Sequence, residues 1–391
     1  MLQLIPIEKN SPSPEFLQVH VNMHLGNPSF IQPLNKDIEA VFDPGKNKSF
    51  KRGDCQRWIL KDEQGNLLGR IAAFVQSRYK NKGDDIPVGG IGFFDCINDQ
   101  VAANTLFDAA KNWLQERKME AMDGPINFGE RDKWWGLLVE GFHPPPYGLN
   151  YHPPYYRKLF ENYGFRVFYE QICWKLQVSG NGHQLLPKFY KAHQKFAPDN
   201  DFEVRQVKKN KLDQFARDFC TVYNDAWAKH EGNKEMSEIQ AIKLFRSMKP
   251  ILDESLAWFT YFRNKPVAMW INIPDLNQIF RHFNGKLHIW NKFRFMYHLR
   301  NGACNRFIGI IYGIVPEFQG SGIDYYMIVE AEKVIKAKGR YRELELMWQG
   351  DFNQKMLGIS RNLGAEESRR LITWRYLFDR NKPFVRHPFI S

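Results

Sequence analysis

The sequence has few cysteines and lacks a long apolar run. Its five cysteines are an odd number and no two lie closer than 41 positions, so we expect neither a disulfide framework nor a Cys-x-x-Cys metal site. The longest charge-free apolar stretch, 307–316, has ten residues, about half of the roughly 20 that a membrane-spanning helix requires. The apolar segment 2–7 is too short for a secretory signal. We therefore expect a reduced, cytoplasmic protein without a membrane partner.

The composition also lacks the polar bias of a disordered chain. Hydrophobic residues make up 43% and aromatic residues 15% of the 391 residues, enough for a sizeable core. The length favours two domains over one. The formal charge is +12, which favours an anionic partner. Residues 1–200 hold 24 basic and 22 acidic residues, whereas the remainder hold 31 and 21, so most of the excess lies in the second half.

The order of expected secondary-structure elements occurs twice, at an offset of about 200 residues. Each half reads strand, helix, two hairpin strands, strand, helix, strand, helix and a last strand that closes the sheet of that half. The expected strands and hairpins lie at 2–7, 58–75, 88–94, 119–123 and 166–176 in the first half, and at 202–207, 258–273, 307–315, 343–348 and 370–378 in the second.

This repeat predicts the fold class and the domain boundaries. We expect an α/β (α+β) protein of two domains in tandem, each a mixed, mostly antiparallel sheet flanked by helices. The first domain spans 1–178, a linker with a bridging helix covers 179–200, and the second domain spans 201–391. Two insertions break the symmetry, the proline-rich segment 124–156 and the segment 275–306. Loops of this size are usually functional or disordered.

A glycine-containing loop follows the strand at 307–315 and precedes a helix. Its sequence is Val315-Pro316-Glu317-Phe318-Gln319-Gly320-Ser321-Gly322-Ile323-Asp324. A strand that leads through glycines into a helix N-terminus favours phosphate, because the backbone can approach closely and free N–H groups and the helix dipole attract negative charge. A plain turn is the alternative interpretation.

The order of elements, this loop and the later Asp351-Phe352-Asn353 resemble the GNAT superfamily of acyl-CoA-dependent N-acyltransferases. The loop pattern of that superfamily is Gln/Arg-x-x-Gly-x-Gly/Ala. Gln319 and Gly322 match its first and fourth positions, whereas Asp324 stands at the sixth. The whole chain is similar to tandem, two-domain GNAT-like proteins of bacteria. The first half contributes to this similarity through Gly69-Arg70-Ile71-Ala72, Gly90-Ile91-Gly92-Phe93-Phe94 and Asp123-Gly124-Pro125.

The resemblance implies that the second half binds acetyl-CoA or another acyl-CoA and transfers the acyl group to a small-molecule or peptide amine by direct attack. The implied cofactor-binding residues are Ile314, Val315, Gln319, Gly320, Ser321, Gly322, Ile323, Asp324 and Asn353. Asn353 is also explained as a helix cap. The corresponding first-half loop, 94–99, has two acids and no glycine, so we expect no phosphate there and a structural first half.

The direction of the Asp324 side chain is important for this cofactor site. A carboxylate in the first turn of a helix is stabilising by about 0.3–1 kcal/mol. The same carboxylate facing the loop would repel a phosphate, by on the order of 4 kcal/mol per charge pair at about 4 Å and an effective dielectric constant near 20. An Asp324 carboxylate inside the loop would therefore argue against binding of acyl-CoA there.

Acyl transfer to an amine requires a base for the amine and an acid for the leaving thiolate. Glu343 and Glu345 alternate on the strand expected to border the acyl site, so each is a candidate base. Each is also explained as a solvated or salt-bridged strand residue. In the resembled family a tyrosine often lies seven residues after the position of Asn353 and serves as the acid. Here Ser360 occupies that position, so the role is vacant or filled elsewhere.

The segment 276–316 contains no acidic residue in 41 positions. Its interleaved cations and aromatics are Arg281, Lys286, Lys292, Arg294, Arg300 and Arg306 with Phe280, Phe283, Trp290, Phe293, Phe295 and Tyr297. Three interpretations stay open. The segment is a lid over an anionic cofactor or substrate, a nucleic-acid surface on which bases stack, or a helical hairpin with core aromatics and solvated cations.

Aromatic residues define the expected substrate cleft. We expect Trp348, Trp290, Tyr155 and Tyr156 to line it, with the proline-rich first-half insertion either at the cleft or acting as a stiff flap. His143 and His152 lack the helical spacing and carboxylate neighbours of a zinc site, so we expect no metal.

The function expected from these observations is an acyl-CoA-dependent N-acyltransferase. A catalytically silent GNAT-fold binding protein is the alternative. A nucleic-acid-binding protein that uses the acid-free segment 276–316 is a third and less favoured hypothesis.

Overall fold

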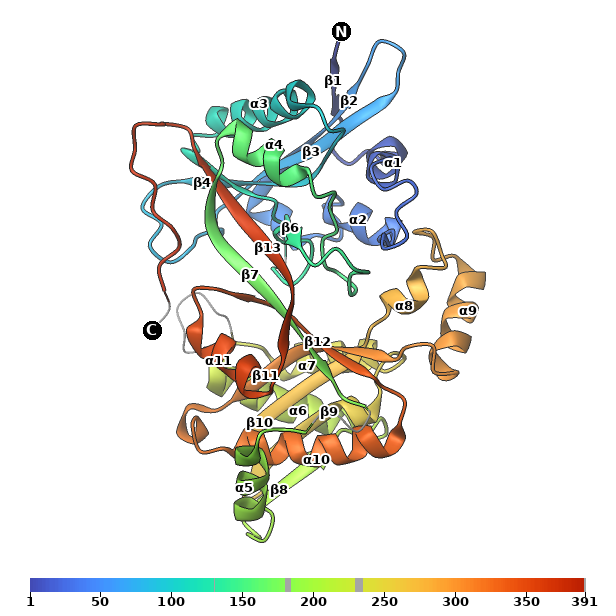
Figure 1. Cartoon of the computed structure of the whole chain (residues 1–391), viewed down its shortest axis with the longest axis vertical. Helices are drawn as coiled ribbons and strands as arrows, with labels where there is room; N and C mark the ends of the chain where they lie inside the picture. Colours follow the sequence, from blue (N-terminus) through green and yellow to red (C-terminus); the bar gives the residue numbers. More distant parts are fainter. Residues whose placement is uncertain (130, 180–183, 229–234, 390–391) are drawn as a thin grey trace.

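The computed structural model describes residues 1–389 apart from 130, 180–183 and 229–234 (Figure 1). In this described part, thirteen strands form one continuous sheet that runs through both halves of the molecule. The strand order is β1-β2-β3-β4-β5-β13-β7-β12-β11-β10-β9-β8, and β6 pairs with β13 beside this path. Helices flank the sheet, so the predicted mixed, mostly antiparallel α/β architecture is confirmed.

The first half contains seven strands and four helices among its described residues. The strands are β1 (Gln3–Ile7), β2 (Gly53–Lys61), β3 (Leu67–Gln76), β4 (Val88–Cys96), β5 (Ala121–Gly124), β6 (Leu137–Glu140) and β7 (Arg166–Gln177). The helices are α1 (Pro14–Asn22), α2 (Asn35–Val41), α3 (Gln100–Glu116) and α4 (Tyr156–Tyr163). The bridging helix expected in the linker is present as α5 (Pro187–Phe196).

The second half repeats this order with additional helices. Its strands are β8 (Phe202–Gln206), β9 (Ala257–Phe262), β10 (Lys265–Pro274), β11 (Arg306–Ile314), β12 (Glu343–Gly350) and β13 (Glu366–Leu377). Its helices are α6 (Leu212–Tyr223), α7 (Glu238–Met248), α8 (Asn277–Phe280), α9 (Ile289–Arg300), α10 (Ile323–Lys338) and α11 (Gln354–Asn362). The insertion 275–306 therefore folds into the helices α8 and α9.

The last strands of the two halves are exchanged. β7 pairs with β12 of the second half, and β13 pairs with β5 of the first half, while β7 and β13 also pair with each other. Figure 1 shows these two long strands side by side between the halves. The prediction that each half closes its own sheet is wrong. The amphipathic pattern of β7 and β13 fixes which face of each strand is buried, but it does not select the neighbouring strand.

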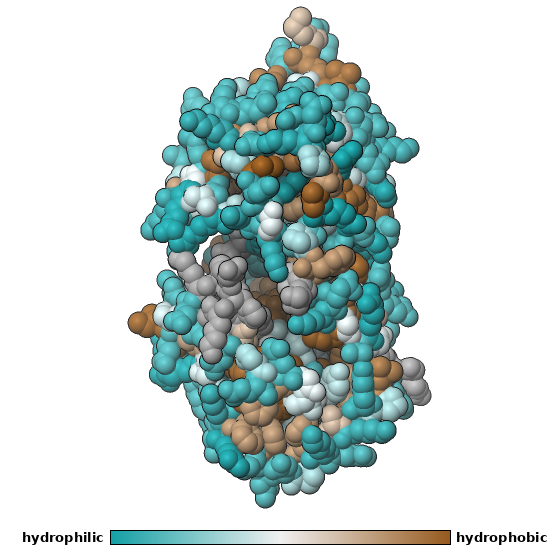
Figure 2. Space-filling model, turned by 90° about the vertical axis from the view of Figure 1, so that its left-hand side faces the viewer, coloured by the Kyte–Doolittle hydropathy of each residue, from teal (hydrophilic) through white to brown (hydrophobic). Residues whose placement is uncertain are grey.

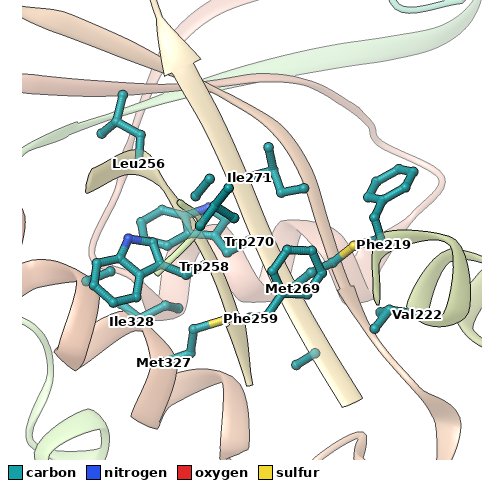
Figure 3. Close-up of a cluster of buried hydrophobic side chains, with 14 of the residues drawn as sticks. Phe219, Val222, Leu256, Trp258, Phe259, Met269, Trp270, Ile271, Met327 and Ile328 are labelled. Atoms are coloured by element: carbon teal, nitrogen blue, oxygen red, sulfur yellow. The ribbon is translucent and has the colours of Figure 1, made fainter. Parts of the chain in front are cut away.

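Separate apolar cores lie in the two halves. Figure 3 shows part of the second-half core, where Phe219 of α6 lies near Met269 of β10, and Met327 of α10 lies on the side of Trp258 of β9. In the first half, one core lies between the sheet and α3, and another lies beneath α1 and α2. The sheet is therefore covered on both faces in each half, which buries its hydrophobic strands.

The outer surface is mainly hydrophilic. Figure 2 shows the face that lies on the left in Figure 1, where polar residues cover most of the area and apolar residues occur in scattered groups. Among the described residues, no helix combines the length and the apolar character needed to cross a bilayer.

Candidate active site

The parallel strands β11 and β12 stop pairing halfway along their length. Their register runs from Arg306 opposite Glu343 to Gly309 opposite Leu346, although β11 continues to Ile314 and β12 to Gly350. Ile310, the first β11 residue beyond this register, is 49% exposed although its strand lies inside the sheet. The far ends of the two strands thus present apolar side chains that are not covered by a neighbouring strand.

The predicted phosphate loop follows β11 at this open end. Gly320 and Gly322 have φ values of +74° and +86°, a left-handed conformation that glycine adopts without strain, and α10 begins immediately afterwards. Ser321 Oγ accepts a hydrogen bond from the Ile323 N–H at 3.3 Å and donates one to the Phe318 carbonyl at 2.6 Å. The Ser321 hydroxyl thus binds polar backbone groups of the loop itself, including the Ile323 N–H.

The Asp324 side chain also lies at the N-terminus of α10. Its carboxylate accepts a hydrogen bond from the Tyr312 hydroxyl, and it is 6% exposed. Burial raises the pKa of the Asp324 carboxyl, while hydrogen bonds from Tyr312 and from the backbone N–H groups of Asp324 and Tyr325 act in the opposite direction. The carboxylate thus lies buried at this helix N-terminus, and the nearby Tyr325 N–H donates to the Gly322 carbonyl at 3.1 Å. This differs from the expectation that the loop presents free amides.

The remaining predicted cofactor residues divide into two groups. Ile314, Val315 and Gln319 lie with the loop, where Gln319 Nε2 donates to the Ile314 carbonyl at 3.3 Å. Asn353 caps α11, because its side chain accepts a hydrogen bond from the Met356 N–H at 3.2 Å. Ser360 is buried, with its hydroxyl 2.8 Å from the side-chain nitrogen of Gln349.

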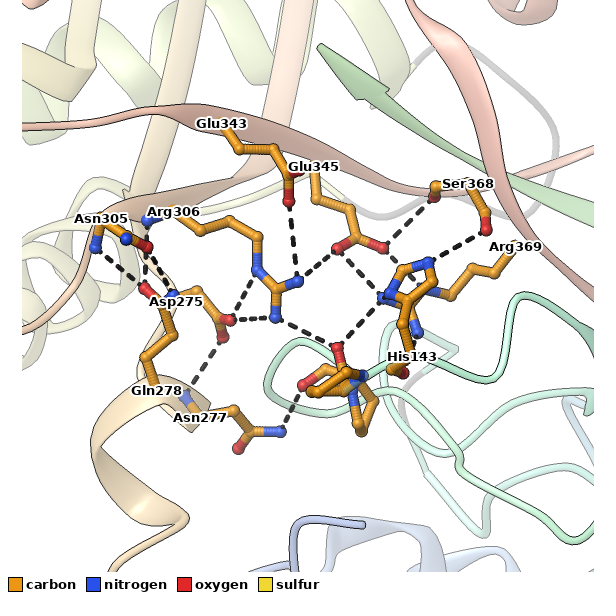
Figure 4. Close-up of polar contacts among 12 residues, drawn as sticks. His143, Asp275, Asn277, Gln278, Asn305, Arg306, Glu343, Glu345, Ser368 and Arg369 are labelled. Atoms are coloured by element: carbon orange, nitrogen blue, oxygen red, sulfur yellow. Dashed lines mark hydrogen bonds and ion pairs between the residues drawn. The ribbon is translucent and has the colours of Figure 1, made fainter. Parts of the chain in front are cut away.

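Glu345 lies in a buried network of charges that joins the two halves (Figure 4). Arg369 of β13 donates to its two carboxylate oxygens at 2.6 and 3.2 Å, and Nη1 of Arg306 lies 3.2 Å from Oε2. Arg306 also donates to Asp275 at 2.6 Å. Two guanidinium groups contact both oxygens of Glu345, so this carboxylate is held in ion pairs and is not free to act as a base.

Glu343 is the more accessible of the two predicted bases. One of its oxygens lies 3.7 Å from Nη1 of Arg306, and the other accepts a hydrogen bond from Gln177 of β7 at 3.3 Å. Its side chain is 27% exposed. The interpretation of both glutamates as salt-bridged strand residues fits these contacts.

The four residues expected to line one substrate cleft lie in different places. Tyr156 is fully buried in the first half, and Tyr155 donates its hydroxyl hydrogen to the Cys96 carbonyl there at 2.7 Å. Trp290 is 72% exposed on α9. Trp348 of β12 packs against first-half residues such as Trp134 and so lies where the halves meet. The structure therefore does not bring the four together.

A polar cluster in the first half was missed by the sequence reasoning. Nδ1 of His20, on α1, lies 3.0 Å from each carboxylate oxygen of Asp95, at the end of β4. Arg70 Nε donates to Asp95 at 2.6 Å, and the Tyr156 hydroxyl donates to it at 3.1 Å. The available signal was the four-residue spacing of His20 and His24, because it places two imidazoles near each other at the end of one helix.

Two further histidines, His24 and His152, lie near His20 and Asp95. The His24 ring lies edge-on to the His20 ring at 4.9 Å between centroids, and neither of its nitrogens has a hydrogen-bond partner among the described residues. His152 Nδ1 accepts a hydrogen bond from the Leu138 N–H at 3.1 Å. Burial lowers the pKa of His24 and of His152 to about 3, so both rings are neutral near pH 7.

The architecture places the chain among tandem GNAT-like folds. It is similar to a tandem GNAT protein from the clavulanic acid biosynthesis pathway, with 11% identity and a TM-score of 0.55, over 98% of this chain and 100% of that one. It is also similar to a GCN5-related N-acetyltransferase from Sphaerobacter thermophilus, with 10% identity and a TM-score of 0.50, over 98% and 97%. The chain therefore has the tandem GNAT-like fold, and the expectation from the sequence resemblance is confirmed.

A curated relative extends this similarity to nearly the whole sequence. The chain is 24% identical over 370 residues to a bacterial ceramide synthase of Caulobacter vibrioides, covering 93% of this chain and 94% of that protein. No family model matches the chain.

Proposed function

We propose that the chain is an N-acyltransferase that receives an acyl group as a thioester and joins it to an amine. The observation that carries this proposal is the end of pairing between β11 and β12, which leaves Ile310 exposed inside a sheet of the tandem GNAT-like fold. An extended apolar chain fits between strands that have stopped pairing, since its CH₂ groups gain about 0.8 kcal/mol each on burial. The full-length similarity to a ceramide synthase supports acyl transfer in general.

The donor in this proposal is an acyl-CoA held mainly through its acyl and pantetheine parts. Because the Asp324 carboxylate lies buried at the start of α10, a diphosphate that binds there meets this carboxylate unless its side chain moves away. We therefore expect palmitoyl-CoA to bind more tightly than free coenzyme A, and Asp324→Ala to strengthen the binding of free coenzyme A. Calorimetric titration of both ligands into the two proteins measures this difference.

The acceptor in this proposal is an amine of the long-chain class. Ceramide is an amide of a fatty acid and a long-chain amino alcohol, so the similarity to a ceramide synthase supports such an acceptor. The sequence suggested a small-molecule or peptide amine as the acceptor. Such amines are therefore compared with the long-chain amine as acyl acceptors in the assay below.

The experiment incubates the protein with palmitoyl-CoA and sphinganine and follows the amide by mass spectrometry and the released thiol by absorbance. Ile310→Arg should abolish the reaction, because it places a charge where the apolar chain lies, while the half-exposed position tolerates the change. Ile239→Arg on α7, at an 80% exposed position, is the matched control. Failure to form an amide from sphinganine or from a panel of small and peptide amines would refute the proposal.

A binding protein without turnover is the second candidate function. The observations that favour it are the Glu345 carboxylate held by two arginines and the Asp324 carboxylate at the start of α10. In that case palmitoyl-CoA binds and Ile310→Arg abolishes binding, yet neither thiol nor amide appears. The same assay therefore separates the two functions.

A further inference from the structure

We propose that Nε2 of His20, oriented by Asp95, is the base that takes the proton from the acceptor amine. This inference rests on the proposed acyl transfer and names the group that assists it. The Asp95 carboxylate lies 3.0 Å from His20 Nδ1 through both oxygens, so Nδ1 donates to Asp95 and Nε2 is the ring nitrogen that remains for the substrate. The His20 side chain is 15% exposed, so a substrate can approach it.

Asp95 is held in place from several directions. Arg70 donates to it at 2.6 Å and Tyr156 at 3.1 Å, and all three side chains are buried. Arg70 is fixed in turn by a hydrogen bond to the Phe16 carbonyl at 2.7 Å. A carboxylate with so many partners keeps one orientation, and it therefore fixes the tautomer and the direction of the imidazole that it contacts.

The cluster has an unsatisfied member that points to a missing ligand. His24 is 4% exposed, and both of its ring nitrogens lack a partner among the described residues. A buried polar group without a hydrogen bond is costly, so such groups usually meet a ligand or a water molecule. His24 lies beside His20, so it is placed to accept a hydrogen bond from, or donate one to, a polar group that binds there.

One apolar cluster connects the histidine cluster with β12 of the second half. The Phe30 ring lies 5.2 Å from the His20 ring and 4.3 Å from the His24 ring between centroids. Phe30 and Trp348 of β12 pack against the same buried apolar cluster, which includes Tyr151. The base thus comes from the first half and the thioester from the second, and this division gives the first half a chemical role.

The proposed step exchanges a C–S bond for a C–N bond. The neutral amine nitrogen forms a C–N bond to the thioester carbonyl carbon, and the C–S bond breaks. The proton released by the nitrogen passes to Nε2 of His20 and from there to the departing thiolate. The products are an amide and a thiol, and the imidazole returns to its neutral form.

A metal ion is the competing occupant of this cluster. The ligand atoms of His20, His24 and Asp95 lie within 4.8 Å of one another. However, Arg70 already neutralises Asp95, so a divalent cation would add two buried positive charges without a carboxylate to balance them. Nδ1 of His20 would also have to lose its hydrogen bond to Asp95. The charge balance therefore favours the base over the metal site.

The first experiment compares His20→Gln and Asp95→Asn with the wild type in the palmitoyl-CoA and sphinganine assay. We expect His20→Gln to lower kcat by about 100-fold or more while the KM for palmitoyl-CoA changes little. Asp95→Asn should lower kcat and change the shape of its pH profile, and added imidazole should partly restore His20→Ala. His282→Gln, at an exposed position, is the control. A kcat for His20→Gln within fivefold of the wild type would refute the proposal.

A second experiment does not depend on acyl transfer. Two-bond ¹H–¹⁵N correlation of the histidine rings, assigned with His20→Gln, reports the tautomer of His20. The Nδ1–H form supports the proposal, whereas the Nε2–H form overturns it. Stoichiometric zinc that binds to the wild type and is lost in His24→Ala also overturns it. If no amide forms with any amine but His20 is the Nδ1–H tautomer, the proposed function fails and the arrangement of the base stands.

A separate observation on α9 supports a second proposal. Ile289, Trp290, Phe293 and Tyr297 are 58%, 72%, 64% and 67% exposed, respectively. Their spacing places all four within an arc of about 100° on one helix face. The inner face of the same helix is buried, with Phe295 packed on Phe280 at 5.3 Å between ring centroids. The hairpin interpretation thus explains the inner aromatics and leaves the outer face unexplained.

We infer that this face binds the surface of an anionic lipid bilayer. The exposed cations on and beside α9 include Arg281, Lys286, Lys292, Arg294 and Arg300. Among the described residues, none of these five forms an ion pair with an acid, and the sequence has no acid from 276 to 316. An exposed face with Trp, Phe, Tyr and Ile beside cations is typical of a helix that lies in the bilayer interface. The sequence led us to expect no membrane partner, because that argument considered only spanning segments.

The test is sedimentation with two kinds of vesicle. One kind contains phosphatidylcholine alone, and in the other about a third of the lipid is anionic phosphatidylglycerol, which gives the surface a negative potential. We expect binding only with the anionic lipid, an at least tenfold loss in Trp290→Ala/Phe293→Ala, and a loss of the lipid preference in Lys292→Glu/Arg294→Glu. Leu25→Ala, at a 75% exposed position, is the control. Equal binding to both vesicles, or binding to a single-stranded oligonucleotide and not to vesicles, would overturn the proposal.

Discussion

The two halves differ at the point where their parallel strands separate. In the first half, β4 and β5 pair from Val88 to Gly90, and the chain after β5 then turns back so that the Ile126 N–H donates to the Ile91 carbonyl at 2.7 Å. In the second half, β11 and β12 pair over the first four residues of β11, and their register ends at Gly309 opposite Leu346. One copy of the fold is thus closed by its own chain, and the other is left open.

Matched positions make the contrast specific. Counted from the first paired residues, Gly92 in β4 corresponds to Ile310 in β11. A Cβ at Gly92 would lie 1.9 Å from the Ile126 carbonyl oxygen, whereas Ile310 is 49% exposed. By the same count Asp95 corresponds to Gly313. The second half therefore has no carboxylate at the position equivalent to Asp95, which contacts His20 in the first half. The comparison suggests that the closed half carries the polar groups and the open half carries the apolar opening.

The largest expected effect breaks the junction of the halves. Arg369→Leu leaves the Glu345 carboxylate buried with one arginine fewer, and we expect the free energy of unfolding to fall by about 3–5 kcal/mol. Urea unfolding followed by circular dichroism measures this. Arg246→Leu removes an exposed ion pair with Asp213, which solvent screens, and should cost far less. Equal losses in the two variants would show that the buried network does not join the halves.

The next effect tests the closed and open strand pairs directly. Gly92→Ala forces a methyl group against the backbone at Ile126, so we expect a loss of about 3 kcal/mol or more. Ile310→Ala removes a half-exposed side chain and should cost less than about 1 kcal/mol. Denaturant midpoints of the two variants provide the measurement. A Gly92→Ala protein as stable as the wild type would contradict the closure of the first half.

A third prediction concerns acid. An unfolded histidine titrates near 6.5, but burial lowers the pKa of His24 and of His152 to about 3, so below pH 6.5 protons bind first to the unfolded chain. Stability from these rings is therefore lost as the pH falls from 7 toward 3, by about 2 kcal/mol per histidine at pH 5. His24→Phe should reduce the difference in unfolding free energy between pH 7 and pH 5 by this amount.

The smallest effect is expected at the start of α10. Asp324→Ala removes a carboxylate that favours the helix N-terminus, but it also removes a buried charge, so the net loss of stability should be below about 1 kcal/mol. Thermal unfolding of this variant and of the control Glu317→Ala, at an exposed position, measures the difference. A loss above about 2 kcal/mol would mean that the Tyr312–Asp324 contact is a main support of the loop.

Much of the fold could be predicted from the sequence. The spacing of apolar residues placed β4, β11 and β12 within two residues of their observed ends, and the glycines at 164 and 364 follow helices as expected. The exchange of β7 and β13 could not be predicted, because both strands have the same length and a similar alternation. The alternation of buried and exposed residues in β7 and in β13 is therefore compatible with either of their two places between β5 and β12.

The candidate site was less accessible from sequence. The residues around Gly322 lie together because they are contiguous, but the direction of Asp324 depends on Tyr312, a contact across the β11–α10 connection. His20 and Asp95 are 75 positions apart and meet only after α1 packs on the sheet. Contacts of this kind follow from tertiary packing and have no local pattern.

The exchanged strands have a consequence for how such a chain can change. A protease cut in the connection between β7 and α5 would leave two pieces that still share one sheet, since each piece supplies the other with an interior strand. Neither piece expressed alone could complete its sheet, so each would expose an unsatisfied strand edge and tend to aggregate. A lineage carrying this arrangement can modify either copy, but it cannot discard one of them.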